Sequence, residues 1–230
     1  MNQSVKLASD LACYRLFQLT SPSLPIGGFT YSQGLEYAVE AGWVTDRDGL
    51  EQWLKYMVNG SVATLELPIL DRLYHAIKQQ DIETIEHWCD VLYTSRETSE
   101  LRAEERQRGQ AFYTLLTKLG IDIDLANGLS SQPNQLLGLC IAAHAWSIDL
   151  ESLKQGYLWS WLENIVTAGV KLVPLGQTDG QLALIHITES FPKVLAQVLK
   201  IEEWMIGSFT PSIAIASSLH ETQYTRLFRS

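Results

Sequence analysis

A long, almost uniformly apolar helix is the feature of this sequence that most constrains its fold. Residues 156–181 read GYLWSWLENIVTAGVKLVPLGQTDGQ, and apolar or small residues recur there at helical spacing: Leu158, Trp161, Leu162, Ile165, Gly169 and Leu172. Pro174 and Gly176 end the helix, because proline lacks an N–H donor and glycine accepts the turn. A helix with so little polar surface is typical of the middle of a bundle. We therefore expect it at the centre of an all-helical fold.

One narrow polar row interrupts this apolar helix. Its members again fall at helical offsets: Ser160, Glu163, Asn164, Thr167 and Lys171. Buried polar groups must find hydrogen-bond partners, so the simplest explanation is that the row pairs with neighbouring backbone or loops.

The remaining signals predict roughly nine or ten helices, counted from caps and stop residues. They are expected over residues 10–19, 33–41, 46–78, 81–92, 95–119, 136–146, 149–173, 177–200 and 212–220. Gly60 and Pro68 bend the long third helix, and Phe191–Pro192 breaks the one before last. Residues 1–9 carry little periodicity and are expected to be frayed, and residues 120–135 have the composition of a loop. The predicted fold class is all-α, a single helical-bundle domain over residues 1–230.

Composition restricts the possible functions. With 230 residues, of which 46% are hydrophobic and 19% charged, the chain can bury a core of its own. The net charge of −9 argues against nucleic-acid binding, which needs a basic face. Cys13, Cys89 and Cys140 have no CxxC spacing, which is typical of free thiols in a reducing compartment.

Apolar runs give no sign of a membrane protein. The amino terminus lacks the apolar run of a signal peptide, and the most apolar window, residues 136–146, is far shorter than the ~20 residues of a membrane span. We expect a cytoplasmic protein.

Motifs for catalysis or metal binding are missing. There is no GxxxxGK[ST] run and no GxSxG elbow, and His220-Glu221 lacks the second histidine of a zincin. The five histidines are dispersed and none has a cysteine at ligand spacing. The charged run over residues 95–119 pairs Glu104 with Arg108 at i, i+4, and a solvated helix face accounts for it.

Two irregular segments, the loop over residues 21–36 and the tail, have the composition of a partner-binding surface. The loop over residues 21–36 reads SPSLPIGGFTYSQGLE, where two prolines and two glycines exclude regular structure. In the tail, Arg226 and Arg229 alternate with Tyr224, Leu227 and Phe228, and arginine with aromatic residues commonly anchors a protein interface.

These segments resemble the UreF family of urease accessory proteins. Four stretches carry the resemblance: LFQLTSPSLPIGGFTYSQGLEYAVEAGWV (16–44), SRETSELRAEERQRGQAF (95–112), YLWSWLENIVTAGVKLVPLGQTDGQ (157–181) and PSIAIASSLHETQYTRLFRS (211–230). The resemblance implies an all-helical homodimer without catalytic activity or a cofactor of its own. It also implies a complex with UreD (UreH in some species) that recruits the nickel-carrying GTPase UreG and docks on apo-urease.

The resemblance also implies where partners bind. Residues 209–230 are similar to a family segment that orders on binding UreD and shapes the surface for UreG. Arg226 matches the family's tail arginine, and Tyr31, Ser32 and Glu36 match its amino-terminal motif. With the other tail residues, these are the candidates for the partner-binding face: Tyr31, Ser32, Glu36, Tyr224, Arg226, Leu227, Phe228 and Arg229.

The family resemblance leaves two further roles open. Ser160, Glu163, Asn164 and Thr167 could line a passage for hydrated Ni²⁺, since oxygen groups bind nickel less tightly than histidine or thiolate; Lys171 would neutralise Glu163 or mark one end. A regulator of UreG would need a cation near the nucleotide, and the candidates are Arg102, Arg106, Arg108 and Lys171. Structural pairing explains the three arginines more simply, so a scaffold ranks above an activator. An enzyme with a site around Glu163 and Lys171 is the rival from outside the family.

Overall fold

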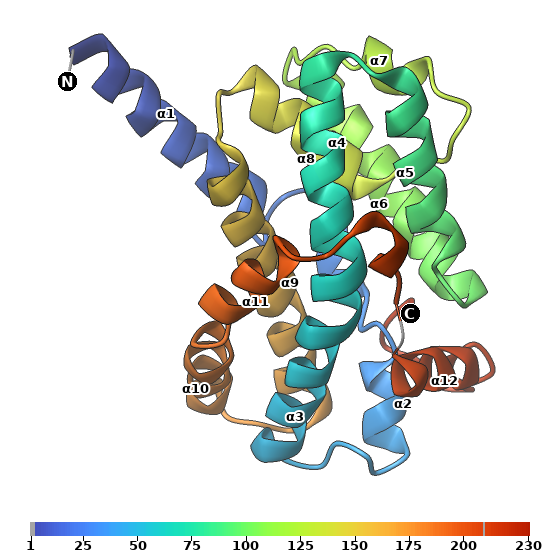
Figure 1. Cartoon of the computed structure of the whole chain (residues 1–230). Helices are drawn as coiled ribbons and strands as arrows, with labels where there is room; N and C mark the ends of the chain where they lie inside the picture. Colours follow the sequence, from blue (N-terminus) through green and yellow to red (C-terminus); the bar gives the residue numbers. More distant parts are fainter. Residues whose placement is uncertain (1–2, 209) are drawn as a thin grey trace.

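The computed structural model describes residues 3–208 and 210–230, with side chains from residue 10 onward except residue 209. This part of the chain contains only helices and connections, and the helices are α1 (Gln3–Thr20), α2 (Leu35–Glu40), α3 (Arg47–Met57), α4 (Leu67–Gln79), α5 (Ile82–Thr94), α6 (Ser99–Lys118), α7 (Asp124–Asn127), α8 (Gln135–Ala145), α9 (Leu150–Leu172), α10 (Gln177–Thr188), α11 (Phe191–Val198) and α12 (Pro211–His220). The prediction of an all-α fold of about ten helices is confirmed (Figure 1).

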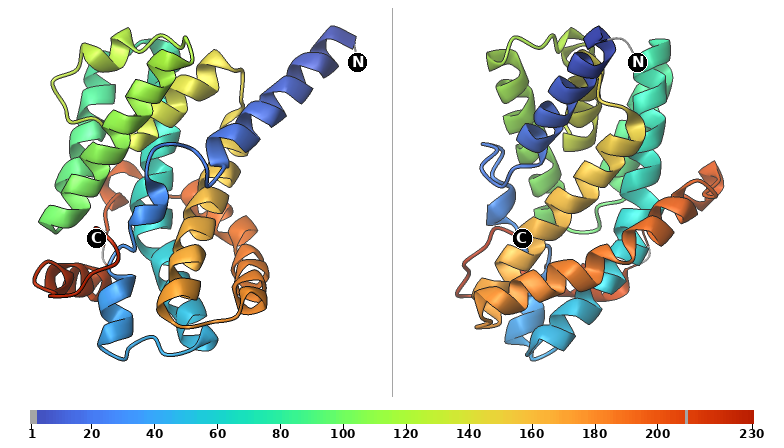
Figure 2. Two further views of the ribbon diagram at one scale, coloured as in Figure 1. Left: turned by 180° about the vertical axis from the view of Figure 1, so that it is seen from behind. Right: turned by 90° about the vertical axis from the view of Figure 1, so that its left-hand side faces the viewer.

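The long apolar helix is α9, and it is the central element of the bundle. It packs against α1, α2, α3, α4, α8, α10 and α11 (Figures 1 and 2). Leu158, Leu162 and Ile165 on its successive turns are buried. The sequence prediction of a central helix is therefore confirmed. The cause is the one expected, because a helix that is apolar on most sides buries its apolar surface only when other helices surround it.

Helix α1 runs outward from the bundle and packs by its carboxy-terminal end on α9 (Figures 1 and 2). Leu16 and Thr20 approach α9 closely at Gly156. The predicted start at Asp10 is wrong, because the helix begins at Gln3. Residues 3–20 contain neither proline nor glycine, so nothing stops the helix from extending toward the amino terminus. The expected fraying of residues 1–9 falls partly outside the described residues and stays a prediction.

The long third helix is bent where the sequence predicted. Val58–Glu66 is wound as a π-helical segment between α3 and α4, and Gly60 has non-helical backbone angles of φ −91° and ψ −111°. Pro68 lies in the first turn of α4, which continues directly from this segment through Glu66 with helical angles, so Gly60 is the residue that marks the bend.

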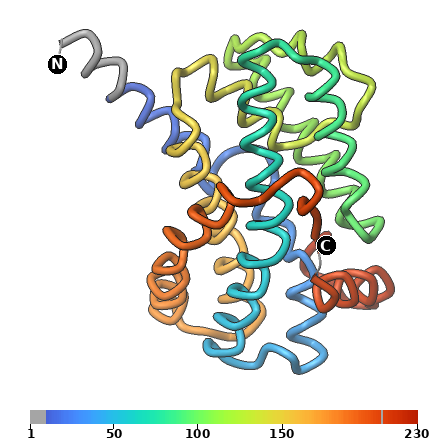
Figure 3. Tube along the Cα trace, in the orientation of Figure 1, coloured from blue at the N-terminus to red at the C-terminus, as the bar shows by residue number. Residues whose placement is uncertain are grey.

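The π-helical segment supports the connection to the end of the chain. The linker over residues 199–208 crosses it, as the orange-red trace in Figure 3 shows. Gly207 N donates to Thr64 O at 3.1 Å, and Thr64 Oγ1 donates back to Gly207 O. A side chain on Gly60 would overlap Thr210, so glycine there lets the linker pass close to the helix.

Two other boundaries were predicted only in part. The expected loop over residues 120–135 contains the short helix α7, and the helix expected over residues 177–200 is divided into α10 and α11. The division falls at Ser190, and Pro192 lies in the first turn of α11, as the predicted break at Phe191–Pro192 requires. None of the helices in the described ranges has the length and apolar character that crossing a bilayer needs.

We expect Gly109→Ala to lower the free energy of unfolding by about 1–3 kcal/mol, because a methyl group at this position on α6 would meet the backbone of Pro133 and Asn134. In an uncrowded helix the same change would stabilise by about 1 kcal/mol, so the sign of the effect is diagnostic. Urea unfolding followed by circular dichroism measures it. Gly128→Ala, at a position with φ −80° and only ordinary contacts, is the control and should not destabilise. Equal stability of the two variants would contradict the close approach.

Candidate functional site

The last ten residues, 221–230, form a tail segment that lies between α2 and α6. Its backbone joins the amino-terminal loop: Arg229 N donates to Thr30 O at 2.9 Å, and Ser32 N donates to Ser230 O at 2.7 Å. Ser32 Oγ also donates to Ser230 O at 2.6 Å and accepts from Glu36 N, so this serine satisfies an N–H in the first turn of α2, whose N-cap is Gly34, and holds the tail at once. The loop and the tail are thus one structural unit.

Glu36, in the first turn of α2, fixes the backbone of the tail segment. Its buried carboxylate accepts hydrogen bonds from Leu227 N at 2.6 Å and from Phe228 N at 2.8 Å. The amino-terminal end of a helix favours a negative charge, which helps to offset the cost of burying this carboxylate. The Leu227 and Phe228 N–H groups have no backbone carbonyl as a partner among the described residues, and the Glu36 carboxylate accepts from both instead.

His220 connects Glu36 to a second carboxylate on α6. Its Nε2 lies 3.1 Å from Glu36 Oε2, and its Nδ1 lies 2.6 Å from Glu100 Oε2. Glu100 in turn accepts a hydrogen bond from Arg226 at 2.7 Å through its other oxygen. The sequence analysis treated His220 only as half of an absent zincin motif and did not find this role.

The start of α6 is capped by the tail as well. Glu221 accepts hydrogen bonds from Ser99 N at 2.8 Å and Glu100 N at 3.2 Å, and from the Ser99 hydroxyl. These bonds, the Ser99 hydroxyl first, lower the pKa of Glu221 below its usual value. The tail segment therefore satisfies donors on α6 that would otherwise have no partner.

The structure brings all the predicted partner-binding residues together but gives them different exposure. Tyr31, Ser32, Glu36 and Phe228 are buried beneath or within the tail segment. Tyr224 and Leu227 are exposed, at 103% and 74% of their surface, and Arg226 and Arg229 are exposed with them. The four buried residues thus lie beneath or within the tail segment, and the four exposed ones form its outer face.

An open cleft of about 470 Å³ lies between the tail segment and α6. Its lining residues are Tyr31, Glu100, Ala103, Gln107, Arg226, Phe228 and Arg229. Tyr31 donates from its hydroxyl to Gln107 Oε1 at 2.9 Å. Burial raises the pKa of Tyr31, with a smaller contribution from Glu104, so the hydroxyl keeps its proton and the donor is permanent near neutral pH.

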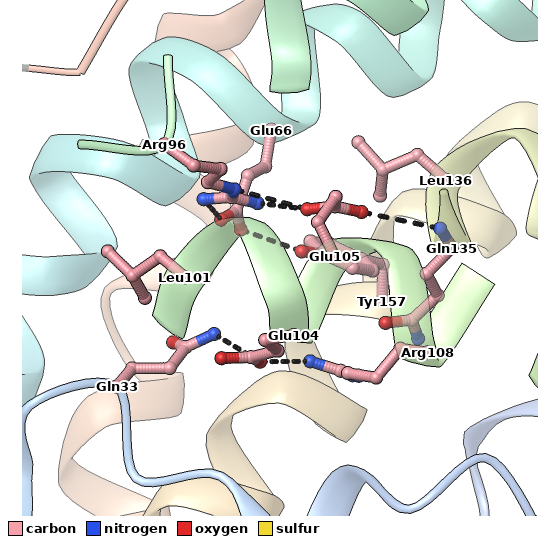
Figure 4. Close-up of a pocket in the computed structure, with 10 residues that line it drawn as sticks. All are labelled: Gln33, Glu66, Arg96, Leu101, Glu104, Glu105, Arg108, Gln135, Leu136 and Tyr157. Carbon is pink, nitrogen blue, oxygen red and sulfur yellow. Dashed lines mark hydrogen bonds and ion pairs between the residues drawn. The ribbon is translucent and has the colours of Figure 1, made fainter. Parts of the chain in front are cut away.

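A buried cluster of charges lies behind this face, where α4, α6 and α9 meet (Figure 4). Arg96 donates to Glu66 at 2.8 Å and, through two nitrogens, to Glu105 at 3.1 and 2.8 Å. The Tyr157 hydroxyl donates to the second oxygen of Glu66 at 2.6 Å. Burial opposes the charge of Arg96, but the two carboxylates more than offset it, so the pKa of Arg96 lies well above its usual value.

Glu104 lies across a small cavity from this cluster and links α6 to the tail segment. Its carboxylate accepts from Gln33 at 3.0 Å, from Arg108 at 2.8 Å and from the Ser230 hydroxyl at 2.9 Å. A cavity of about 20 Å³ separates the Glu104 pair from the Arg96 pair in Figure 4. Loop, tail and α6 are therefore linked through one carboxylate.

The predicted solvated face of α6 is wrong for the residues of this cluster. Glu104 is only 4% exposed and Glu105 only 7%. Both fall on the same stripe of the helix as the buried Leu101 and Phe112, at i, i+3, i+4 and i+11. Their helical phase therefore indicated a buried position, and the prediction missed it because it considered only their charge.

The polar row of α9 is divided between two surroundings. Glu163, Thr167 and Lys171 line a cleft of about 120 Å³ against α10, together with Gln177 and Gln181. Burial raises the pKa of Glu163 above its usual value, against a smaller opposite effect of a hydrogen bond with Trp159. Among the described ion pairs, none joins Glu163 to Lys171.

Asn164 lies away from that cleft. It donates to the Ser160 carbonyl at 2.8 Å, and its amide lies against Gly28 in the 3-10 turn Gly28–Thr30. For Asn164 the simple explanation, pairing with backbone, agrees with the structure. Ser160 takes part through its backbone carbonyl, and for its hydroxyl this explanation stays a prediction.

The four cationic side chains singled out in the sequence fall into two groups, those with structural partners and those that are exposed. Arg108 pairs with Glu104, and Arg102 donates to Arg96 O at 2.7 Å, so both have structural partners. Arg106 and Lys171 are exposed. Within the described part of the chain, no group of three or more His, Cys, Asp or Glu side chains is arranged to hold a metal ion.

Comparisons with known proteins give one consistent result. The model of the UreF family matches residues 44–188 of this chain. A protein of Alcanivorax borkumensis, named urease accessory protein UreF, is 50% identical over 231 residues, which cover 96% of this chain and 100% of that protein. Proteins of the same name from Pseudomonas putida GB-1 and Klebsiella pneumoniae 342 are 49% and 44% identical, over 96% and 94% of this chain and 99% and 96% of their own lengths.

Arg96→Leu should lower the free energy of unfolding by about 3–5 kcal/mol, because it leaves Glu66 and Glu105 buried without their shared cation. Denaturant unfolding of the purified chain measures the loss. Arg106→Leu removes the same charge from an exposed position of α6 and should change stability by no more than about 0.5 kcal/mol. A similar small effect of both substitutions would show that the cluster does not need its arginine.

Proposed function

The chain belongs to the UreF family of urease accessory proteins, and from this membership we propose that it is a non-catalytic scaffold for the assembly of the urease nickel centre. In this proposal the chain forms a homodimer in the cytoplasm and binds UreD (UreH). The complex recruits the GTPase UreG and docks on apo-urease. Ni²⁺ is cargo that passes from UreG to urease, and the chain has no cofactor of its own.

The outer face of the tail segment is the observation that carries this proposal. It presents Tyr224, Arg226, Leu227 and Arg229 on a backbone that Glu36 and Ser32 hold in place. Exposed tyrosine, arginine and leucine side chains around a central cleft are suited to anchoring a partner. Because the backbone is already fixed, binding costs less conformational entropy than it would for a free tail. Ordering of residues 209–230 on binding UreD, which the family resemblance implies, stays a prediction.

A second role, passage of Ni²⁺, is favoured by the cleft between α9 and α10. Glu163, Thr167, Gln177 and Gln181 offer only oxygen and amide groups, which hold a divalent nickel ion less firmly than imidazole or thiolate would. The cleft is open along the surface, so a partner has to cover it before it can act as a closed path. Regulation of UreG by an exposed cation, Arg106 or Lys171, is the alternative role.

Co-purification with UreD and UreG tests the scaffold proposal. We expect the full chain to retain both partners and the double variant Tyr224→Ala/Leu227→Ala to retain about tenfold less UreG, because two exposed anchors are lost. Ile82→Ala, an exposed apolar position on α5, is the matched control and should retain UreG fully. Removing residues 210–230 is a weaker experiment, because it also uncovers Glu36.

Failure of the full chain to bind either partner would overturn the scaffold proposal. The isolated chain would then have to be examined for catalysis around Glu163 and Lys171.

Activation of urease tests the passage. We expect Glu163→Gln together with Thr167→Leu to lower the nickel content and activity of urease matured with this chain, because the first replaces the carboxylate of the cleft by a neutral amide and the second removes its hydroxyl oxygen. Gln155→Leu, at an exposed position of the same helix, controls for a new leucine on α9. Unchanged nickel content in the double variant would rule out this path.

A further inference from the structure

His220 is completely buried, with a carboxylate against each of its ring nitrogens. Glu100 Oε2 on α6 lies 2.6 Å from Nδ1, and Glu36 Oε2 on α2 lies 3.1 Å from Nε2. These two carboxylates are the charged groups that face the ring, and Arg226 of the tail segment lies behind Glu100 at 2.7 Å. The imidazole therefore bridges two helices at the point where the tail segment begins.

Both carboxylates also accept hydrogen bonds from groups other than the ring, and we take both as ionised. Glu36 accepts from Leu227 N and Phe228 N, one on each oxygen, and Glu100 accepts from the Arg226 guanidinium. An ionised carboxylate has no hydrogen to give, so each ring nitrogen has to be the donor. A neutral imidazole has only one N–H group, whereas the imidazolium ion has two.

We propose that His220, as its imidazolium ion, is the positioning residue of the tail segment. It holds Glu36 where that carboxylate can bind the backbone of Leu227 and Phe228, and it holds Glu100 where that carboxylate can orient Arg226 on the rim of the cleft. The four groups form a neutral chain of alternating sign: Glu36, His220, Glu100 and Arg226. That this surface serves partner binding rests on the proposed function, but the positioning itself does not.

Loss of the ring proton would loosen the tail segment. A neutral ring leaves one buried carboxylate facing a nitrogen lone pair, and that carboxylate loses a charge-assisted hydrogen bond. A ring that loses its proton as the pH rises therefore holds the tail segment less firmly.

Hydrogen exchange of the full chain measures this coupling. The observable is the protection of the Leu227 and Phe228 amides, expressed relative to the intrinsic exchange rate at each pH from about 5 to about 8, the range in which histidines change charge. We expect protection of these two amides to fall on the order of tenfold across the range. Amides of the buried helix α4 serve as the internal reference and should keep their protection.

Glu100→Gln separates a proton-dependent role from simple packing. The glutamine amide can donate to the neutral Nδ1 while its oxygen still accepts from Arg226, so the fall in protection at high pH should disappear. His220→Gln should lower protection throughout the range. His87→Gln, at an exposed histidine on α5, should leave the wild-type profile unchanged.

Two results would overturn the inference: protection that does not change with pH in the wild-type chain, or a Glu100→Gln profile identical to that of wild type. Capture of UreG at neutral pH is measured separately on the same samples. If the exchange profiles are as expected but wild-type chain does not retain UreG, then the positioning role stands and the proposed function fails. If UreG is retained but protection does not change with pH, then the positioning role fails and the proposed function stands.

Discussion

Burying a carboxylate costs several kcal/mol unless donors surround it, and this constraint shapes the side of the molecule where α2, α4, α6 and the tail segment meet. Glu36, Glu66, Glu104 and Glu105 are all buried there. Arg96 and Arg108 supply the charges, Tyr157 and Gln33 supply further donors, and the tail supplies backbone amides and a hydroxyl. The end of the chain thus supplies hydrogen-bond donors to the buried carboxylates Glu36 and Glu104, and the positions of these carboxylates determine its path.

The same constraint explains which parts of the architecture are visible in the sequence. The central position of α9, the bend at Gly60 and the break before Pro192 follow from local periodicity and from the backbone chemistry of glycine and proline, and they were predicted. The buried charges of α6 were not, because hydropathy assigns Glu104 and Glu105 to solvent whatever their helical phase. Apart from Arg108 on the same helix, their closest partners come from connections and from the end of the chain, so the sequence of α6 alone does not reveal that these residues are buried.

The candidate site shows the limit of sequence reasoning in a different way. The candidate partner-binding residues came from the composition of the tail and from family resemblance, and the structure brings them together. What the sequence could not reveal is that Tyr31, Ser32 and Glu36 lie beneath the surface and act on it from below. The hydrogen bond from Phe228 N to Glu36 joins residues 192 positions apart, and His220 completes the link from the start of the tail. The polar row of α9 was identified correctly as a row, but its members turn toward two different neighbours.

The π-helical segment Val58–Glu66 has a consequence for how the length of this chain can vary. It joins α3, which packs on α10, to α4, which packs on α5 and α8, so the extra winding sets the angle between two buried faces. Removing one residue from an α-helix turns everything beyond it by about 100°. A deletion or insertion within these nine residues would rotate one apolar face out of its contact, whereas the connection over residues 128–132, between α7 and α8, could absorb the same change. Length variation should therefore accumulate in loops and be excluded from the middle of this bent helix.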